Sequence, residues 1–394
     1  MIPFDHQIQL AEDAYEILRE HFIVYLACEE RTGKTLAAIL TAEMTSVETV
    51  LVITKKTPVQ DWKDTLAAFK HKKKYTVTNY HNAHKQSRHD LVILDESHNY
   101  ISGYPKPSAM WKKLRALLVD TPLIYISATP HAQGYQMLYH QFALSSWSPW
   151  ARHSNFYQWF KVYGRPYTVP INGVDINQYD RTQEAKIKAS TDHLFITKTR
   201  KELGFAQEPK DKLHYVELDQ STKDMYNTLI EDQIIQLPEG WLVCDTQPKL
   251  RFALHMLEGG TAKIEDQRIT LPNNEKIDFI LDHFGDSSSL VIMYNYIQEF
   301  TKLSKYFKKA LLLQATSFAE GVDLHEYDNL VIYSQDFSTA RHTQRRARQA
   351  NKKRLKPIIV HYVLVKKATS EKVYRTVSIK KKNFVDKIYA GDKL

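Results

Sequence analysis

Near its N-terminus the chain reads Ala27-Cys28-Glu29-Glu30-Arg31-Thr32-Gly33-Lys34-Thr35, between an apolar run at 22–26 and a helix-like segment from Leu36 to Met44. A strand, a tight loop, Gly-Lys-Thr and a helix form the layout that binds nucleotide phosphates, with backbone N–H groups and a lysine facing the anion and a threonine hydroxyl on Mg²⁺. The run is imperfect, because Cys28 replaces the first glycine of the G-x-x-x-x-G-K-[ST] pattern. Taken alone, this run is equally consistent with a nucleotide site and with an ordinary loop.

Composition narrows the class of protein. The 394 residues are 43% apolar and 25% charged, enough for two or three domains with their own cores. No run of about eighteen apolar residues predicts a membrane span, and the N-terminus lacks the features of a signal peptide, so we expect a cytoplasmic protein. Two cysteines exclude a disulfide framework, and the formal net charge of +9 favours a polyanionic partner.

Strand-like and helix-like segments alternate in two series. Between them, residues 131–285 show few strand signals and many helix-like or aromatic-rich stretches. Such alternation predicts βαβ units and parallel sheets covered on both faces. We therefore expect an α/β fold with an N-terminal lobe at 1–150, a helical protrusion and linker at 151–215, and a C-terminal lobe at 216–394. The expected strands are 22–27, 50–54, 91–94, 123–127, 290–294, 310–314, 329–334 and 358–365, and the clearest helices 57–69, 109–119 and 297–308.

Two adjacent carboxylates, Asp95 and Glu96, end the buried strand that begins at Leu91. Nucleotide hydrolysis needs one carboxylate to hold Mg²⁺ and another to orient or deprotonate the attacking water. The carboxyl end of a strand is where an open α/β sheet places its ligands. Acidic residues often end a strand for no functional reason, but their position after Gly33-Lys34-Thr35 favours a catalytic pair.

A further apolar strand ends in Ser127-Ala128-Thr129. With this tripeptide the chain resembles the helicase superfamily two ATPases, whose ordered motifs include G-K-T, D-E-x-H and S-A-T. Further segments resemble the Swi/Snf-like double-stranded DNA translocases within that superfamily, and together the similarities cover residues 3–365. These segments are Phe4 to Gln7, Val50 to Trp62, Thr129 to Tyr135 with Phe156 to Phe160, Phe195 to Leu203, Ala315 to Leu324 (fifth motif) and Gln344 to Gln349 (sixth motif).

The resemblance implies two RecA-like parallel-sheet lobes with ATP and Mg²⁺ between them. Lys34 and Thr35 would hold phosphates and metal, Asp95 would hold metal through water, and Glu96 would be the general base. The second lobe would be trimmed, because only about one helix fits between 290–294 and 310–314. The resemblance also implies further nucleotide contacts, which are Gln7 (adenine), Arg31, Thr32, Gly33, Gly321 and Asp323. The residues that would couple the site to the rest of the molecule are His98, Ser127 and Thr129. The residues that would contact DNA are Lys55, Lys56, Thr57, Thr316 and Ser317.

Arginines near residue 345 are the candidates for stabilising transition-state charge. Arg345 and Arg348 are three residues apart, a spacing that places both on one face of a helix, and arginine fingers contribute about 10³–10⁵ in rate in other phosphoryl-transfer systems. Arg341 and Arg346 are the alternatives, and the competing interpretation is a basic helix that faces solvent or DNA.

Two residues depart from the family pattern: Arg31 stands where the phosphate loop usually has a glycine, and Cys28 where it has an acid.

The leading hypothesis is a DNA-dependent ATPase that translocates on double-stranded DNA. A strand-separating or branch-migrating helicase and a DNA-binding adaptor with a decayed ATPase stay open. The small size also resembles bacteriophage-encoded helicase-like proteins, which would act in the host cytoplasm.

Overall fold

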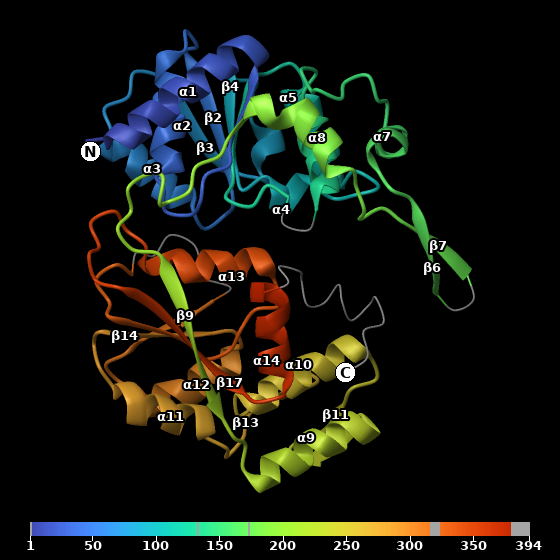
Figure 1. Ribbon diagram of the computed structural model, residues 1–394, viewed down its shortest axis with the longest axis vertical. Helices are drawn as coiled ribbons and strands as arrows, with labels where there is room; N and C mark the ends of the chain where they lie inside the picture. The colour runs from blue at the N-terminus through green and yellow to red at the C-terminus, as the bar shows by residue number, and fades with distance from the viewer. Residues whose placement is uncertain (1, 132–133, 172–173, 316–323, 380–394) are drawn as a thin grey trace. The chain divides into compact units, whose positions relative to one another are not determined.

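The chain carries two parallel β-sheets, one in each of two units, Met1–Gly204 and Phe205–Leu394 (Figure 1). The computed structural model describes residues 2–131, 134–171, 174–315 and 324–379. Within these ranges, no helix has both the length and the apolar character needed to cross a membrane. The α/β class predicted from the sequence is confirmed, with a sheet of 6 strands in unit 1 and one of 5 strands in unit 2.

Unit 1 is built on the strand order β3-β2-β4-β5-β1-β8. All four strands predicted for this unit are present and form the centre of the sheet. The strands at the two edges, β3 and β8, were not predicted. The strands are β1 (Ile23–Leu26), β2 (Thr49–Thr54), β3 (Lys74–Asn79), β4 (Leu91–Asp95), β5 (Leu123–Ile126) and β8 (Phe195–Ile196).

Helices cover both faces of this sheet. α1 packs along α2 (Figure 1), and it also contacts β1, while α2 contacts β5. The other face is covered by α4 to α7. The helices of unit 1 are α1 (Asp5–His21), α2 (Lys34–Met44), α3 (Val59–Ala68), α4 (His98–Ile101), α5 (Ala109–Leu118), α6 (Leu138–Phe142), α7 (Phe156–Tyr163) and α8 (Glu184–Thr191), with 3₁₀ turns at Ala83–Lys85, Tyr135–Met137 and Asp192–Leu194.

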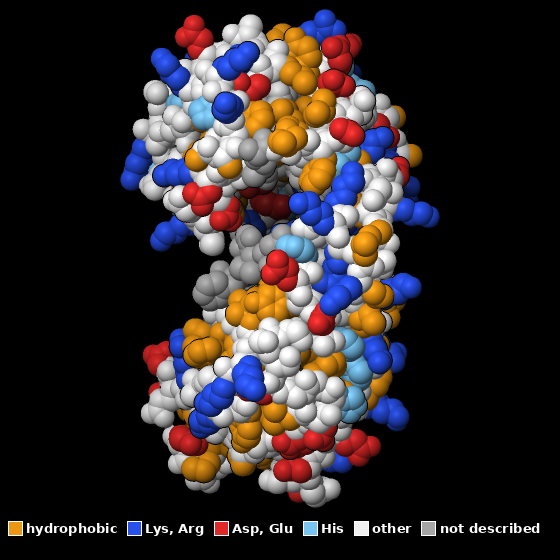
Figure 2. Space-filling model, turned by 90° about the vertical axis from the view of Figure 1, so that its left-hand side faces the viewer, with side chains coloured by type: hydrophobic (Ala, Val, Ile, Leu, Met, Phe, Trp, Pro, Cys, Tyr) orange, Lys and Arg blue, Asp and Glu red, His pale blue; other side chains and the backbone are white. Residues whose placement is uncertain are grey.

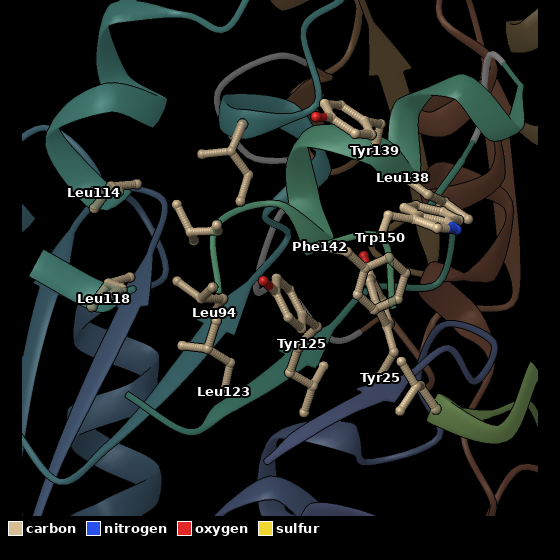
Figure 3. Close-up of a cluster of buried hydrophobic side chains, with 14 of the residues drawn as sticks. Tyr25, Leu94, Leu114, Leu118, Leu123, Tyr125, Leu138, Tyr139, Phe142 and Trp150 are labelled. Carbon is tan, nitrogen blue, oxygen red and sulfur yellow. The ribbon is translucent and has the colours of Figure 1, made fainter. Parts of the chain in front are cut away.

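Aromatic side chains fill the core between β1, β5 and α6 (Figure 3). Tyr25 and Tyr125 stack with ring centroids 5.1 Å apart, and Phe142 meets Trp150 edge to face at 5.6 Å. The buried hydroxyls of the two tyrosines both donate to Gln141: Tyr25 to its Oε1 at 2.8 Å, and Tyr125 to its backbone carbonyl at 2.7 Å. This rigid core fixes the strand ends that carry the candidate site.

The expectation of a largely helical insert at 131–285 is wrong in part, because this region also contains β6 to β13. One antiparallel hairpin, β6 (Tyr167–Ile171) with β7 (Val174–Gln178), projects from unit 1 (Figure 1). Two more hairpins pack with α9 (Gln220–Asp232) and α10 (Gln247–Glu258) around a small core of their own. They are β10 (Ile234–Leu237) with β11 (Gly240–Val243), and β12 (Thr261–Ile264) with β13 (Gln267–Thr270).

Unit 2 is organised by the order β15-β14-β16-β17-β9, all parallel. Between β14 and β15 the chain forms one helix, α12, as predicted. The edge strand β9 was not predicted. The remaining elements are β9 (Pro209–Val216), α11 (Glu275–Phe284), β14 (Leu290–Tyr294), α12 (Ile297–Tyr306), β15 (Leu311–Gln314), β16 (Asn329–Ile332), α13 (Thr339–Arg346), η4 (Ala347–Gln349), β17 (Ile358–Val365), α14 (Thr369–Tyr374) and η5 (Arg375–Ile379).

Candidate active site

The loop from Ala27 to Gly33 joins β1 to the N-terminus of α2, as the sequence predicts. Gly33 is the N-cap residue and has φ +81°, and Arg31 has φ +66°. Position 31 therefore takes the left-handed backbone for which glycine is suited, and the arginine adopts it at a cost of about 1–2 kcal/mol. Thr32 is buried and its hydroxyl donates to the Glu29 carbonyl at 2.8 Å. The loop is formed despite the departure at Arg31.

Lys34 and Thr35 are the first two residues of α2. The Lys34 ammonium group turns back over the loop and donates to the carbonyls of Cys28 at 2.7 Å and Glu29 at 2.6 Å. Backbone N–H groups in the first turn of an α-helix have no partner within the helix and give its N-terminus positive character. The loop, the helix terminus and the lysine together make an anion-binding arrangement.

Gln7, on α1, lies against this loop. Its Oε1 accepts from the Phe4 N–H at 2.9 Å, and its Nε2 donates to the Gly33 carbonyl at 3.4 Å. A Cβ placed on Gly33 would lie only 1.9 Å from Gln7 Nε2. His6 contacts the same loop through the Thr32 carbonyl, at 3.1 Å. The structure thus brings Gln7 to the phosphate loop, and its role in reading adenine stays a prediction.

Asp95 ends β4 and is held by two neighbours that sequence reasoning did not assign to the site. Thr54, at the end of β2, donates to Asp95 Oδ2 at 2.8 Å, and the Trp62 indole on α3 donates to the same oxygen at 3.0 Å. Burial raises the pKa of Asp95, while these two hydrogen bonds and the charges of Lys55 and Lys34 act to lower it. Both donors reach Oδ2, so this carboxylate is held in one orientation.

Glu96 follows in a strained turn, with φ +51°. Its Oε2 is buried, lies 3.5 Å from His98 Nδ1, and accepts no hydrogen bond from the part of the chain that the structure describes. Burial, and next the charge of Asp95, raise the pKa of Glu96 to about 8. A carboxylate with a pKa near the working pH is suited to take a proton from water.

His98, Ser127 and Thr129, predicted to couple the site to the rest of the molecule, form one hydrogen-bonded group. Ser127 Oγ lies 2.9 Å from His98 Nδ1, and the Thr129 N–H donates to Ser127 Oγ at 3.0 Å. Burial lowers the pKa of His98 to about 3, so the ring is neutral. Ser97 Oγ, next to Glu96, donates to Gln141 Oε1 at 3.1 Å. The carboxylate turn is therefore tied to the aromatic core.

The three residues predicted to touch the DNA backbone from unit 1 differ in placement. The charge of Lys55 acts to lower the pKa of Asp95, Glu96 and His98. Lys56 and Thr57 are exposed. The structure thus connects Lys55 to the catalytic candidates electrostatically, and a DNA contact by any of the three stays a prediction.

The candidate arginines of unit 2 lie around Asp336. Arg341 Nη1 is 2.8 Å from Asp336 Oδ2, and the buried Arg345 donates to the same oxygen at 3.3 Å and to Asn295 Oδ1 at 3.5 Å. Burial lowers the pKa of Arg345 to about 10.

Arg346 instead binds β9, with Nε donating to Asp211 Oδ1 at 2.6 Å and Nη2 to the Pro209 carbonyl at 2.8 Å. Arg348 lies in the 3₁₀ turn η4, which follows directly on the end of α13 at Arg346. Arg341 and Arg345 share Asp336 as a partner, and the pairing of Arg345 with Arg348 at the phosphates stays a prediction. Thr316, Ser317, Gly321 and Asp323 lie outside the described residues.

Comparisons with known proteins add a resemblance of overall structure. No family model matches the chain, and no curated protein matches it. The Sulfolobus solfataricus SWI2/SNF2 ATPase core in complex with dsDNA is 15% identical, over 98% of this chain and 93% of that one, with a TM-score of 0.42. The Pyrococcus furiosus Hef helicase domain is 13% identical, over 95% and 98%, with a TM-score of 0.49. The chain is similar to these two solved structures at low identity, and the bacteriophage origin stays a prediction.

Proposed function

We propose that this chain is an ATPase whose hydrolytic site lies in unit 1. One observation supports the proposal: the phosphate loop follows β1 and the Asp95–Glu96 pair ends β4, and both strands pair in parallel with β5. Groups that the sequence separates by up to 62 positions therefore follow strand ends at the same edge of one sheet. A nucleotide triphosphate with its metal is the ligand class that this set of groups suits.

The residues present fit ATP and Mg²⁺. The loop and the N-terminus of α2 would bind phosphate oxygens, and Lys34 would transfer its hydrogen bonds from two loop carbonyls to them. Magnesium prefers one or two carboxylates together with substrate phosphates and water, and Asp95 with the Thr35 hydroxyl supplies such a set. When bound, the ion neutralises charge on the outer phosphates. Thr54 and Trp62 keep the Asp95 carboxylate in one orientation.

Glu96 would be the general base. Its buried Oε2 is available to accept a proton, and neighbouring cations lower the pKa that burial has raised. The neutral His98 ring beside it would orient the carboxylate without competing for the proton. The sequence resemblance further assigns Arg345 and Arg348 to the transferring phosphate, and Gly321 and Asp323 to the nucleotide; these roles belong to the proposal.

Double-stranded DNA is the partner we propose, on the basis of the sequence resemblance and the net charge of +9. Figure 2 shows one face of the molecule, on which Lys and Arg side chains are spread over both units among acidic and apolar ones. Contacts between Lys or Arg and DNA phosphates position a protein on the duplex without reading its sequence. Lys55, Lys56, Thr57, Thr316 and Ser317 are the proposed contacts.

We expect phosphate release to rise several-fold with duplex DNA at low salt, and this stimulation to fall as salt increases because counterion release drives backbone binding. Lys56→Ala should weaken the stimulation, and Lys113→Ala, which removes an exposed lysine of α5, should leave it intact. A coupled phosphate-release assay over a salt series measures both effects.

Three other results would contradict the proposal of a duplex translocase. Release of the displaced strand from a gapped duplex would make the chain a helicase. Stimulation by single strands alone would exclude the duplex as the track. DNA binding without turnover would support an adaptor with a decayed ATPase.

A further inference from the structure

The phosphate loop is bonded along one side to a segment that lies almost 170 residues further along the chain. The Ala27 N–H donates to the Ile196 carbonyl at 2.9 Å, and the Glu29 N–H donates to the Lys198 carbonyl at 3.0 Å. These bonds extend the parallel pairing of β1 with β8 beyond the end of both strands. Residues 27–29 therefore behave as a strand extension whose partner is the segment 196–198.

Arg200 adds a charged attachment at the end of this pairing. Its backbone N–H donates to Glu29 Oε2 at 2.7 Å. Its guanidinium lies 3.5 Å from Glu30 Oε2 and donates to the Glu30 carbonyl at 3.4 Å. The Arg200 side chain is only 8% exposed and that of Glu30 13%. Removing one partner of such an enclosed pair leaves the other charge buried and uncompensated, which is strongly unfavourable.

Glu29 is bonded both to Lys34 and to the segment 198–200. Its carbonyl accepts from Lys34 Nζ, its N–H donates to Lys198, and its carboxylate accepts from the Arg200 N–H. A change in the position of the Lys34 ammonium group thus acts on a residue that is also bonded to the segment 198–200. Gly204, four residues after Arg200, is the last residue of unit 1.

We propose that Arg200 is a positioning residue that holds the phosphate loop through Glu29 and Glu30, and that phosphates bound by the loop alter the segment 197–203. This inference rests on the proposed nucleotide site. A polyphosphate draws Lys34 Nζ away from the Cys28 and Glu29 carbonyls, which loosens Glu29 and with it the bonds to Lys198 and Arg200. The segment 197–203 leads along the chain directly into unit 2, so nucleotide occupancy is passed to the connection between the units.

Hydrogen exchange of the full chain, with and without a non-hydrolysable ATP analogue, tests this inference. We expect the analogue to change the exchange rate of amides 197–203 by at least about threefold in the native protein, since local opening sets such rates. Arg200→Gln should abolish this change and raise KM for ATP about tenfold or more, because the loop loses its attachment. Arg200→Lys keeps the positive charge but not the forked geometry of the guanidinium. It should therefore restore part of the exchange response and bring KM for ATP part of the way back to the native value.

Lys201→Gln is the matched control, because it removes the same charge from the neighbouring exposed residue; it should behave as the native protein. Analogue binding, followed by calorimetry, separates two kinds of failure. Binding without any change in 197–203, or an Arg200→Gln variant with the native exchange response and KM, would overturn the inference while the nucleotide site stands. Absence of binding by folded native protein would overturn the nucleotide site and the inference with it.

Discussion

Glu96→Gln is expected to reduce phosphate release by about 10²–10⁴-fold, the usual contribution of a general base, and to stabilise unit 1 at alkaline pH. Glutamine has almost the same shape as glutamate but cannot accept the proton of the attacking water. The variant should still bind nucleotide, because Lys34, Thr35 and Asp95 are unchanged. Nucleotide binding with little hydrolysis is therefore the expected phenotype.

The effect on stability follows from the raised pKa of Glu96, about 8 against an ordinary value of 4.5. The folded state favours the protonated form, so this stabilising contribution is complete below about pH 4.5 and is lost as the pH rises through 8. Each pKa unit corresponds to about 1.4 kcal/mol. Because glutamine stays neutral, the variant should exceed the native protein by at least about 2 kcal/mol at pH 9 and match it at pH 4.5.

Urea unfolding followed by tryptophan fluorescence measures this difference, since five of the six tryptophans lie in unit 1. Glu12→Gln, at an exposed position of α1, is the control and should show no such pH dependence. Stability curves that run parallel to the native protein from pH 4.5 to 9, or turnover near the native rate, would contradict the assignment of Glu96.

Gly33→Ala is expected to destroy nucleotide affinity while the protein still folds. The added methyl group would lie 1.9 Å from Gln7 Nε2 and 3.0 Å from its Cδ, so the end of the Gln7 side chain must move away from Gly33 and lose its bond to the Gly33 carbonyl. A side chain at φ +81° adds strain of about 1–2 kcal/mol. Loss of the αL geometry would also turn the first N–H groups of α2 away from bound phosphate.

Gly204→Ala is the control for backbone strain, because it adds a methyl group at a positive φ outside the phosphate loop. Gly204 has a similar φ of +77°, but no heavy atom of the described chain lies within 4 Å of the added Cβ. It should therefore lose similar stability and keep full affinity for a fluorescent ATP analogue. Adding Gln7→Ala to Gly33→Ala should recover part of the stability by removing the clash. Equal affinities of the two glycine variants would show that Gly33 has no special role in binding.

The central strands of both sheets could be predicted from sequence because each is a continuous apolar run buried on both faces. The edge strands β3, β8 and β9 could not, because β3 and β9 are only partly buried and carry lysines that interrupt the pattern, such as Lys74 and Lys210, and β8 has only 2 residues. The hairpins were missed for a related reason, although Asn172-Gly173 between β6 and β7 is a hairpin signal in the sequence. These elements lack the full burial that makes the central strands recognisable.

The residues of the candidate site likewise divide into those that could be predicted from the sequence and those that could not. Lys34, Asp95 and Glu96 could be named because each follows or ends a recognisable strand. Thr54 and Trp62 could not be assigned to Asp95, since only the folded sheet brings the ends of β2 and β4 together. Arg200 and the Arg341–Asp336–Arg345 group depend likewise on contacts that sequence spacing does not encode.

Whether unit 1 hydrolyses ATP is tested by steady-state phosphate release in the presence of duplex DNA, comparing the native protein with Lys34→Ala. Lys34→Ala removes the cation of the phosphate loop and leaves the core, the carboxylates and their partners in place. We expect turnover by the native protein and its loss in the variant, with both proteins equally folded by circular dichroism. Equal turnover of the two proteins, or no turnover by the folded native protein, would contradict the proposed site.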